Sequence, residues 1–241
     1  MRYLASALLI LLTVWSAQSQ TYEVGFMAGG ANYIGDIGNT TYINPQTLAL
    51  GGIVKWNRSR RHAFRASFLY AKIEGDDAKS NENSRQQRGY SFENSIKEAS
   101  LGLEYTFWDY DVHNNSKWIS TPYLYTGITA FLYDKSGTLD KGYGIGMGDG
   151  TEQVQNTQTG IEFAIPMVLG YKARLNPHVF MGFEIGARYT FTDNLDGSNS
   201  ATSKRPNPDG QFGNINNDDW YMFTGITLTF AFGRLPCYCD F

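Results

Sequence analysis

The most constraining feature of the chain is a strict two-residue alternation in residues 220–232. One side of this segment carries large apolar side chains, Trp220, Met222, Ile226, Leu228, Phe230 and Phe232. The other side carries mostly small or polar ones, Tyr221, Gly225, Thr227, Thr229 and Ala231. Because successive side chains of a β-strand point to opposite faces, the segment predicts a strand with one apolar wall and one tight polar wall.

Seven earlier segments show the same alternation, at residues 21–30, 47–57, 62–73, 96–108, 121–133, 161–175 and 178–191. Each is long enough to cross a bilayer as a tilted strand, for which about 9–11 residues suffice. Aromatic residues make up 15% of the chain and there are 26 glycines, a composition typical of many short strands. The sequence therefore predicts an all-β fold, an eight-stranded antiparallel transmembrane up-and-down barrel.

The charged residues decide between a membrane barrel and a soluble one. Ten of them fall on the small or polar faces, and we expect none on the apolar faces. The acids are Glu23, Glu98, Glu104, Glu162 and Glu184, and the bases are Lys55, Arg65, Lys172, Arg174 and Arg188. A soluble up-and-down barrel or sandwich, the alternative, would spread its charges over the outside, whereas a membrane barrel encloses them.

The interior of an eight-stranded barrel is just wide enough to be filled by side chains. Isolated charges there would be unfavourable, so we expect the five acids and five bases to pair with one another. The sequence thus predicts a filled lumen that conducts nothing.

Residues 1–19 have the form of a cleaved signal peptide, with Arg2 before an apolar stretch at 4–15 and an exit at Ala17-Gln18-Ser19. The apolar stretch is too short to span a bilayer as a helix, and the alternative is a retained anchor. We expect the barrel to occupy residues 20–233 and a tail to occupy 234–241. Losing Arg2 changes the formal net charge from −3 to −4, which argues against a nucleic-acid partner.

Connection lengths predict the orientation in the membrane. Short connections are expected at residues 58–61, 109–120 and 176–177, and long ones at 31–46, 74–95, 134–160 and 192–219. Outer-membrane barrels have short periplasmic turns and long external loops. We therefore expect the chain in the outer membrane, surrounded by lipid, with both termini in the periplasm.

Motifs with catalytic or ligand-binding chemistry are weak. The glycine-rich residues 29–39 neither follow a buried parallel strand nor open a helix, so a phosphate cradle is not expected. Residues 141–150 and 193–198 offer oxygens for calcium but lack the full spacing of a calcium site. The histidines, His62, His113 and His178, lie near the short connections without a matching nucleophile. We expect no enzyme, no cofactor and no metal.

The tail carries the most specific chemical feature, Cys237 and Cys239, beyond Pro236. In an oxidising periplasm such thiols favour a disulfide to a partner. Two alternatives stay open: a local disulfide, strained by the closeness of the two residues, or a metal site that includes Asp240. Docking of the tail to a partner is the working hypothesis.

The sequence resembles the PorG-like outer-membrane barrels of the Bacteroidota type IX secretion and gliding machinery. The resemblance rests on the signal peptide, the eight-strand layout, the segment from Gly29 to Ile37 with its Asn32-Tyr33-Ile34-Gly35-Asp36 core, and the terminal 227–233 with its tail. It covers essentially the whole mature chain.

The resemblance implies a non-enzymatic component that attaches the periplasmic PorK/PorN ring, a lipoprotein and its partner, to the outer membrane. In that role we expect the periplasmic turns and tail to bind the ring, through Arg58, Arg60, Arg61, Cys237 and Cys239. The alternative is a free-standing barrel whose external loops mediate adhesion or bind a ligand.

Overall fold

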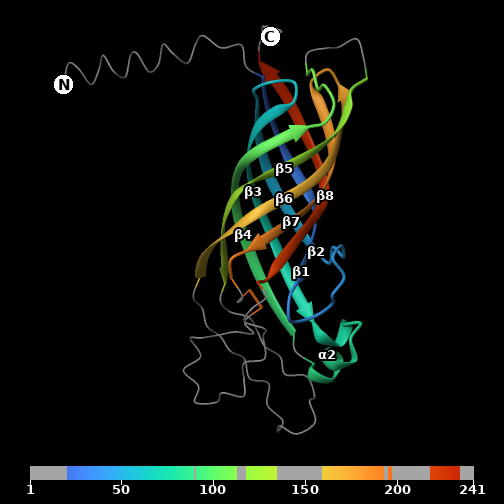
Figure 1. The fold of residues 1–241 in the computed structure, drawn as a ribbon, viewed down its shortest axis with the longest axis vertical. Helices are drawn as coiled ribbons and strands as arrows, with labels where there is room; N and C mark the ends of the chain where they lie inside the picture. Colours follow the sequence, from blue (N-terminus) through green and yellow to red (C-terminus); the bar gives the residue numbers. More distant parts are fainter. Residues whose placement is uncertain are drawn as a thin grey trace, which may run out of the picture.

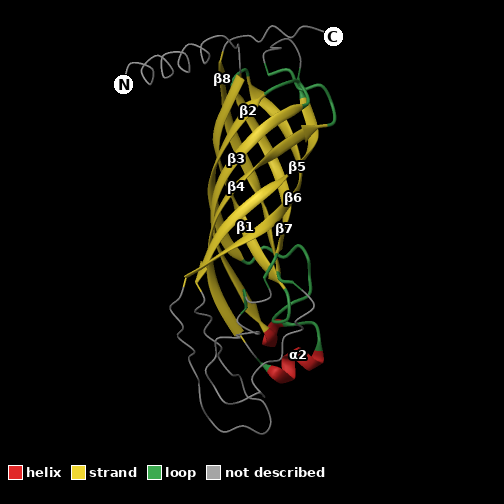
Figure 2. Cartoon of the chain, turned by 60° about the vertical axis from the view of Figure 1, so that its left-hand side comes forward, coloured by secondary structure: helices red, strands yellow, loops and turns green. Residues whose placement is uncertain are grey.

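The structure is a computed structural model that describes residues 21–89, 91–112, 118–134, 159–192, 195–196 and 218–233. These residues form a closed antiparallel barrel, drawn in Figure 1 with its long axis vertical. Its strands are β1 (Thr21–Ile34), β2 (Thr47–Asn57), β3 (His62–Asp76), β4 (Ser91–Thr106), β5 (Ser120–Asp134), β6 (Thr159–Asn176), β7 (Val179–Thr190) and β8 (Trp220–Gly233). The β3–β4 connection contains a 3-10 helix, η1 (Asp77–Lys79), and an α-helix, α2 (Asn83–Arg88) (Figure 2).

Each strand pairs with the next one along the chain, and β8 closes the barrel by pairing with β1. The closing ladder runs from Thr21 opposite Gly233 to Ile34 opposite Trp220. The segment with the clearest alternation therefore forms one side of the closing seam. The predicted eight-stranded antiparallel up-and-down barrel is confirmed.

Several strands extend further than the alternation predicts. The bounds of β2 are as expected, but β1 continues to Ile34, β3 continues to Asp76, and β4 begins at Ser91. Most of the loop expected at 74–95 is consequently strand or helix. The reason is that the β3–β4 ladder persists up to the pair Asp76 and Ser91, where hydrogen bonding continues without an alternating apolar face.

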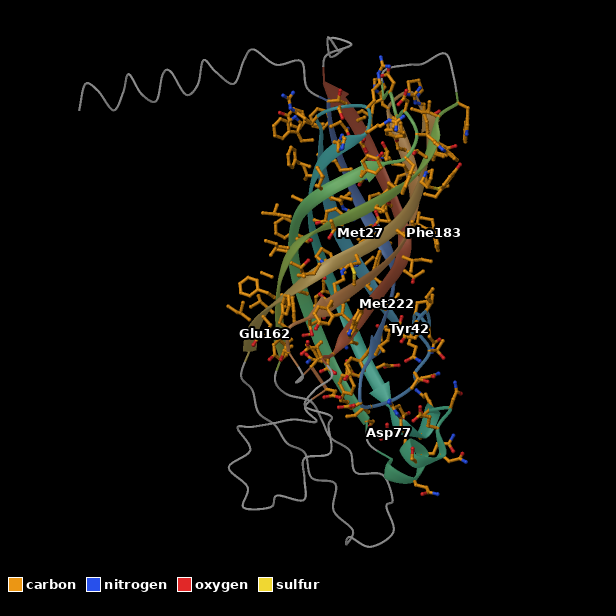
Figure 3. The ribbon with its side chains drawn as sticks, viewed as in Figure 1. Met27, Tyr42, Asp77, Glu162, Phe183 and Met222 are labelled. Atoms are coloured by element: carbon orange, nitrogen blue, oxygen red, sulfur yellow. The ribbon has the colours of Figure 1, made fainter. Side chains whose placement is uncertain are left out.

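The two faces of the barrel wall differ as the sequence predicts. Large apolar side chains project outward along every strand, for example Phe26, Leu101 and Phe183. Figure 3 shows Phe183 on the outer side of the wall and Met27 within the barrel. Polar side chains and small residues face inward, which is the distribution of a barrel whose solvent is lipid. Among the described residues, no helix is long and apolar enough to span a membrane.

One expectation about the outer face is wrong. Lys72 on β3 and Lys97 on β4 point outward, on the same side of their strands as Phe68 and Ala99. Both lysines lie in the halves of β3 and β4 that lead to the connection with η1 and α2. The apolar band ends before the strands do, and alternation alone does not show where.

The two ends of the barrel are built differently. The start of β1, the end of β8 and the connections 58–61, 107–119 and 177–178 share one end, here called the short-loop end. The opposite end, with η1 and α2 beside it, is called the long-loop end (Figure 1). Toward the long-loop end the lumen is filled by an apolar cluster that includes Met27, Phe92 and Phe131. The buried glutamates, lysines and arginines lie nearer the short-loop end, whereas the buried Asp77, Asp196 and Asp219 lie at the long-loop end.

Candidate functional site

The centre of the lumen is an ionic cluster around the carboxylate of Glu104, from β4. Nζ of Lys172 lies 2.6 Å from one of its oxygens, and Nζ of Lys55 lies 2.8 Å from the other. Nη1 of Arg65 approaches the same carboxylate at 3.6 Å. Three cations, from β2, β3 and β6, therefore share one buried anion. Glu104 thus links β4 to its neighbour β3 and to β2 and β6, which are not adjacent to it.

Two further ion pairs complete the cluster, which we call the lumen network. Arg65 binds Glu184 through both oxygens, at 2.7 and 2.9 Å. Tyr123 donates its hydroxyl to Glu184 at 2.5 Å. Such two-pronged contacts between a guanidinium and a carboxylate fix orientation as well as charge.

The second pair lies between Arg188 on β7 and Glu98 on β4, at 2.8 Å. Tyr221 on β8 donates its hydroxyl to Glu98 at 2.6 Å. Glu184 and Glu98 thus each receive a phenol as well as a cation. Closely paired charges from β2, β3, β4, β6 and β7 occupy this part of the lumen.

The ten predicted lumen residues divide by position. Nine are buried, whereas Glu162 is only half buried, near the long-loop end of β6. Glu23 accepts hydrogen bonds from Asn57 and Thr229. Arg174 donates to the backbone carbonyls of Asp111 and Val112. The charges therefore do not sort into five acid–base pairs, because the stagger of the strands brings several cations to one carboxylate.

A segment of the β4–β5 connection closes the short-loop end. Tyr110 and Val112 are buried there against Phe180 and Ala231, and Ile119 packs on the same cluster. Nζ of Lys172 sits 4.0 Å from the centre of the Tyr110 ring. We call residues 110–112 the plug. No pattern in the sequence indicates the plug, because the connection has no periodicity and its residues predict an ordinary turn.

The phenol of Tyr110 in the plug is held in its neutral form. Burial raises the pKa of the Tyr110 phenol well above its ordinary value, and the carboxylates of Glu23 and Glu104 raise it further. The hydroxyl is buried without a hydrogen-bond partner in the described part of the chain. Tyr110 therefore closes this end of the lumen as a neutral side chain, through the packing of its ring.

The predicted arginines lie on the 58–61 turn, beside the plug. Arg58 and Arg61 are exposed, while Arg60 is half buried. The carbonyl of Arg60 accepts from the backbone N–H of Tyr110 at 3.1 Å, and Arg61 pairs with Asp109 at 3.0 Å. The turn and the plug thus form one connected surface, although the exposed Arg61 pair adds little stability of its own.

A serine and a histidine meet in the same turn, with Oγ of Ser59 3.2 Å from Nδ1 of His62. Oγ of Ser59 also accepts from the backbone N–H groups of Arg61 and His62. This is the hydrogen bonding of a tight turn, in which the hydroxyl is already engaged. In the described ranges, no three His, Cys, Asp or Glu side chains gather in a way that could hold a metal ion.

The Asn-Tyr-Ile-Gly-Asp segment folds into the mouth of the long-loop end. The hydroxyl of Tyr33 lies 2.7 Å from a carboxylate oxygen of Asp196 and donates to Asp219. Gly35 is required beside it, because a Cβ there would lie 1.9 Å from the Tyr33 hydroxyl. In the sequence the segment stands out as glycine-rich and as part of the resemblance to PorG-like barrels, and in the structure it covers the apolar half of the lumen.

Hydrogen bonds to the β3–β4 connection fix the position of the chain that follows Tyr33, residues 35–38. The backbone N–H of Gly38, which has a φ of +86°, donates to the buried carboxylate of Asp77 at 2.8 Å. Nη1 of Arg85 on α2 donates to the carbonyls of Gly35 and Gly38. Figure 3 shows Asp77 at this end, next to α2. Both ends of the barrel are therefore closed by folded segments.

Several sequence predictions fall outside the described residues. They are the signal peptide at 1–19, His113, residues 141–150, most of 193–198, and the tail with Cys237 and Cys239. The disulfide of the tail to a partner, with its two alternatives of a local disulfide and a metal site, remains a prediction.

With this geometry in place, the family can be stated. A family model described as a domain of unknown function, DUF6089, matches residues 2–241. The chain belongs to the DUF6089 family. No curated protein sequence matches the chain. Membership of DUF6089 brings no activity or partner with it, so the function has to be argued from the barrel itself.

Solved structures with a similar fold include outer-membrane proteins of several bacteria. Ail, the attachment invasion locus protein of Yersinia pestis, solved with the heparin analogue sucrose octasulfate, is 5% identical, with a TM-score of 0.48 over 89% of this chain and 99% of that one. A major outer membrane protein of Thermus thermophilus is 14% identical, with a TM-score of 0.46 over 89% and 100%. The N-terminal barrel of Pseudomonas aeruginosa OprF is 10% identical, with a TM-score of 0.42 over 89% and 98%. Similarities this distant say nothing about what this chain binds.

Proposed function

We propose that this protein is a non-enzymatic outer-membrane component of the type IX secretion machinery. Its short-loop end would face the periplasm, together with both termini. There it would attach the PorK/PorN ring, a lipoprotein and its partner, to the outer membrane. The resemblance of the Asn32-Tyr33-Ile34-Gly35-Asp36 segment, the strand layout and the cysteine tail to PorG-like barrels motivates the assignment.

The observation that carries the proposal is the surface at the short-loop end. The turn that bears Arg58 and Arg61 is fixed to the end of β4, where the backbone N–H of Thr106 donates to the carbonyl of Arg61 at 2.8 Å. It is also fixed to the plug, where the backbone N–H of Tyr110 donates to the carbonyl of Arg60. A turn held in this way presents its cations in one arrangement, which lowers the entropy lost when a partner docks.

The closed interior supports an anchoring role over transport. The plug closes one end, the Tyr33 segment covers the other, and the lumen network fills the space between them. A barrel of this kind offers its partners its two end surfaces and its lipid-facing wall. The short-loop surface carries the exposed arginines, and it adjoins the end of β8, from which the tail continues.

The test is charge reversal on the short-loop surface. We expect Arg58→Glu with Arg61→Glu to reduce co-purification of the ring proteins in mild detergent and to impair secretion of cargo. Lys79→Glu, an exposed lysine at the other end of the barrel, is the matched control and should leave both unchanged. Ring proteins that co-purify equally with both variants would refute the anchoring surface.

The tail is tested separately by Cys237→Ala and Cys239→Ala on non-reducing gels. Loss of a crosslinked band together with impaired secretion supports a disulfide to the ring. If no band changes and secretion is intact, the tail does not crosslink. If deleting the external loops then abolishes adhesion instead, the free-standing barrel is the correct function.

A further inference from the structure

The outward lysines of β3 and β4 mark a boundary on the barrel wall. On β4, the outward residues from Tyr105 through Leu103, Leu101 and Ala99 are uncharged, and Lys97 is the next one. On β3, the outward face is likewise uncharged from Phe64 until Lys72. Beyond these lysines, toward the long-loop end, acidic residues also appear on the outer face.

The height of this boundary matches the edge of a membrane. Lys97 is eight residues along β4 from Tyr105, and Lys72 is eight residues along β3 from Phe64. At a rise of about 3.4 Å per residue and a tilt of about 40°, eight residues climb about 20 Å. The lipid-facing band of outer-membrane barrels is about 25 Å tall. Counted from the outward rings of Phe64 and Tyr105 near the short-loop end, both lysines therefore lie close to the far edge of such a band.

The two lysines are neighbours across the β3–β4 ladder. Lys97 is paired with Tyr70, and Lys72 with Ser95, so the lysines are diagonal to each other. Diagonal neighbours on one face of a sheet lie about 7–8 Å apart at their backbones. Two flexible ammonium groups and a phenol can therefore reach one anion.

Their existing partners differ. Nζ of Lys72 pairs with Glu93 at 2.5 Å. Lys97 has no carboxylate within 4 Å in the part of the chain that the structure describes, and its side chain is exposed. An ammonium at the edge of hydrocarbon extends toward the interface and is stabilised there by an anion.

Next to Lys97, on the side of the short-loop end, the outer surface of the wall has a shallow depression because its side chains are small. Ala99 and Ala130 face each other across β4 and β5, and Phe68 and Phe163 flank them on the next strands. The two rings are 66% and 53% exposed, so they stand out from the wall on either side of the alanines. An acyl chain can lie over the alanines between the rings, with its headgroup at Lys97.

We propose that Lys97, Lys72 and Tyr70 form a binding site for a phosphorylated lipid of the surrounding leaflet. The lysine ammonium groups and the tyrosine hydroxyl donate to phosphate oxygens, and an acyl chain packs over Ala99 and Ala130. Charge complementarity selects this occupant, because lipid is what offers a phosphate joined to a chain at this height. The orientation in the proposed function makes the leaflet the outer one, and the lipid then is lipid A.

The experiment measures lipid binding to the purified full-length barrel in detergent by native mass spectrometry. Lipid A, lipid A without phosphates, and phosphatidylglycerol are titrated separately. We expect lipid A to bind best, removal of its phosphates to abolish specific binding, and Lys97→Gln to weaken binding about tenfold. Lys79→Gln removes an exposed lysine outside the site and should bind like the unmodified protein.

The outcomes separate the site from the orientation. Equal binding by Lys97→Gln and Lys79→Gln, or equal binding of lipid A without phosphates, overturns the site. A dimer of the chain that Lys97→Gln disrupts, with no lipid bound, overturns it as well, because a second copy would be the occupant. Lys97-dependent binding of phosphatidylglycerol in preference to lipid A leaves the phosphate site standing and contradicts the orientation of the proposed function.

Discussion

Replacement of Glu104 by glutamine tests whether the lumen network holds the barrel together. Glutamine keeps the shape of the side chain and removes its charge, so Lys55 and Lys172 lose the carboxylate at 2.8 and 2.6 Å. All three side chains are almost completely buried, and removal of one partner from a buried ion pair destabilises a protein by about 3–5 kcal/mol. We expect a loss of stability in this range.

The measurement is reversible urea unfolding of the barrel in lipid vesicles, followed by the altered mobility of the folded form on unheated gels. With a denaturant slope of about 1–3 kcal/mol per molar, the midpoint should fall by about 1–5 M. Glu162→Gln is the matched control, because Glu162 faces the same way but is only half buried near the long-loop end. Its midpoint should change by less than about 0.5 M.

A Glu104→Gln midpoint within error of the control would refute the reasoning. It would mean that Lys55 and Lys172 find solvent or other anions, and that the lumen is wetter than a filled interior allows. A larger loss in Glu104→Gln than in Glu162→Gln, with an unchanged fold, supports the network as the main polar contribution to stability.

Three smaller predictions concern the closures at the two ends. Tyr110→Phe should leave the unfolding midpoint almost unchanged because the hydroxyl has no partner, whereas Tyr110→Ala should lose about 3–5 kcal/mol. The pKa of Tyr110 is higher in the folded than in the unfolded protein. The neutral phenol therefore contributes fully to the free energy of unfolding below the ordinary pKa of about 10, and this contribution is lost as pH rises through the pKa of the folded state. Titration of stability above pH 10 should therefore show a smaller loss in Tyr110→Phe, and equal alkaline losses would contradict burial of the phenol. Gly35→Ala places a Cβ 1.9 Å from the Tyr33 hydroxyl and should raise hydrogen exchange of the long-loop end, while Gly52→Ala, which meets only one atom at 4.0 Å, should not.

The sequence predicts the barrel well because a membrane wall imposes a simple rule on every strand. Each of the eight segments alternates, and the inward parity of Tyr123, Glu184 and Arg188 follows directly from it. The same parity places Lys72 and Lys97 on the outward face, so the expectation of an uncharged outer face overlooked them. Alternation does not show how far along the barrel axis the apolar band extends. The alternation of apolar and polar residues also ends where the strands extend beyond the apolar band. For this reason the pattern predicts that β4 starts at residue 96, five residues after its actual start at Ser91.

The details of the site depend on geometry that periodicity does not carry. Which base meets which acid depends on strand tilt and stagger, so the convergence of three cations on Glu104 was not predictable. The plug at Tyr110 lies in an irregular connection. The hydrogen bond from the backbone N–H of Gly38 to the carboxylate of Asp77 joins two segments far apart in sequence. Neither leaves a local pattern.

The orientation of the barrel in the outer membrane is the claim on which the proposed function most depends. It can be measured by cysteine labelling with a membrane-impermeant maleimide, in a background with Cys237→Ala and Cys239→Ala. Asn81→Cys marks the exposed β3–β4 connection, and Ser59→Cys marks the turn between Arg58 and Arg60. Labelling of Asn81→Cys in intact cells, with Ser59→Cys labelled only after the outer membrane is permeabilised, is the predicted result. Labelling of Ser59→Cys in intact cells, with Asn81→Cys protected, would contradict it.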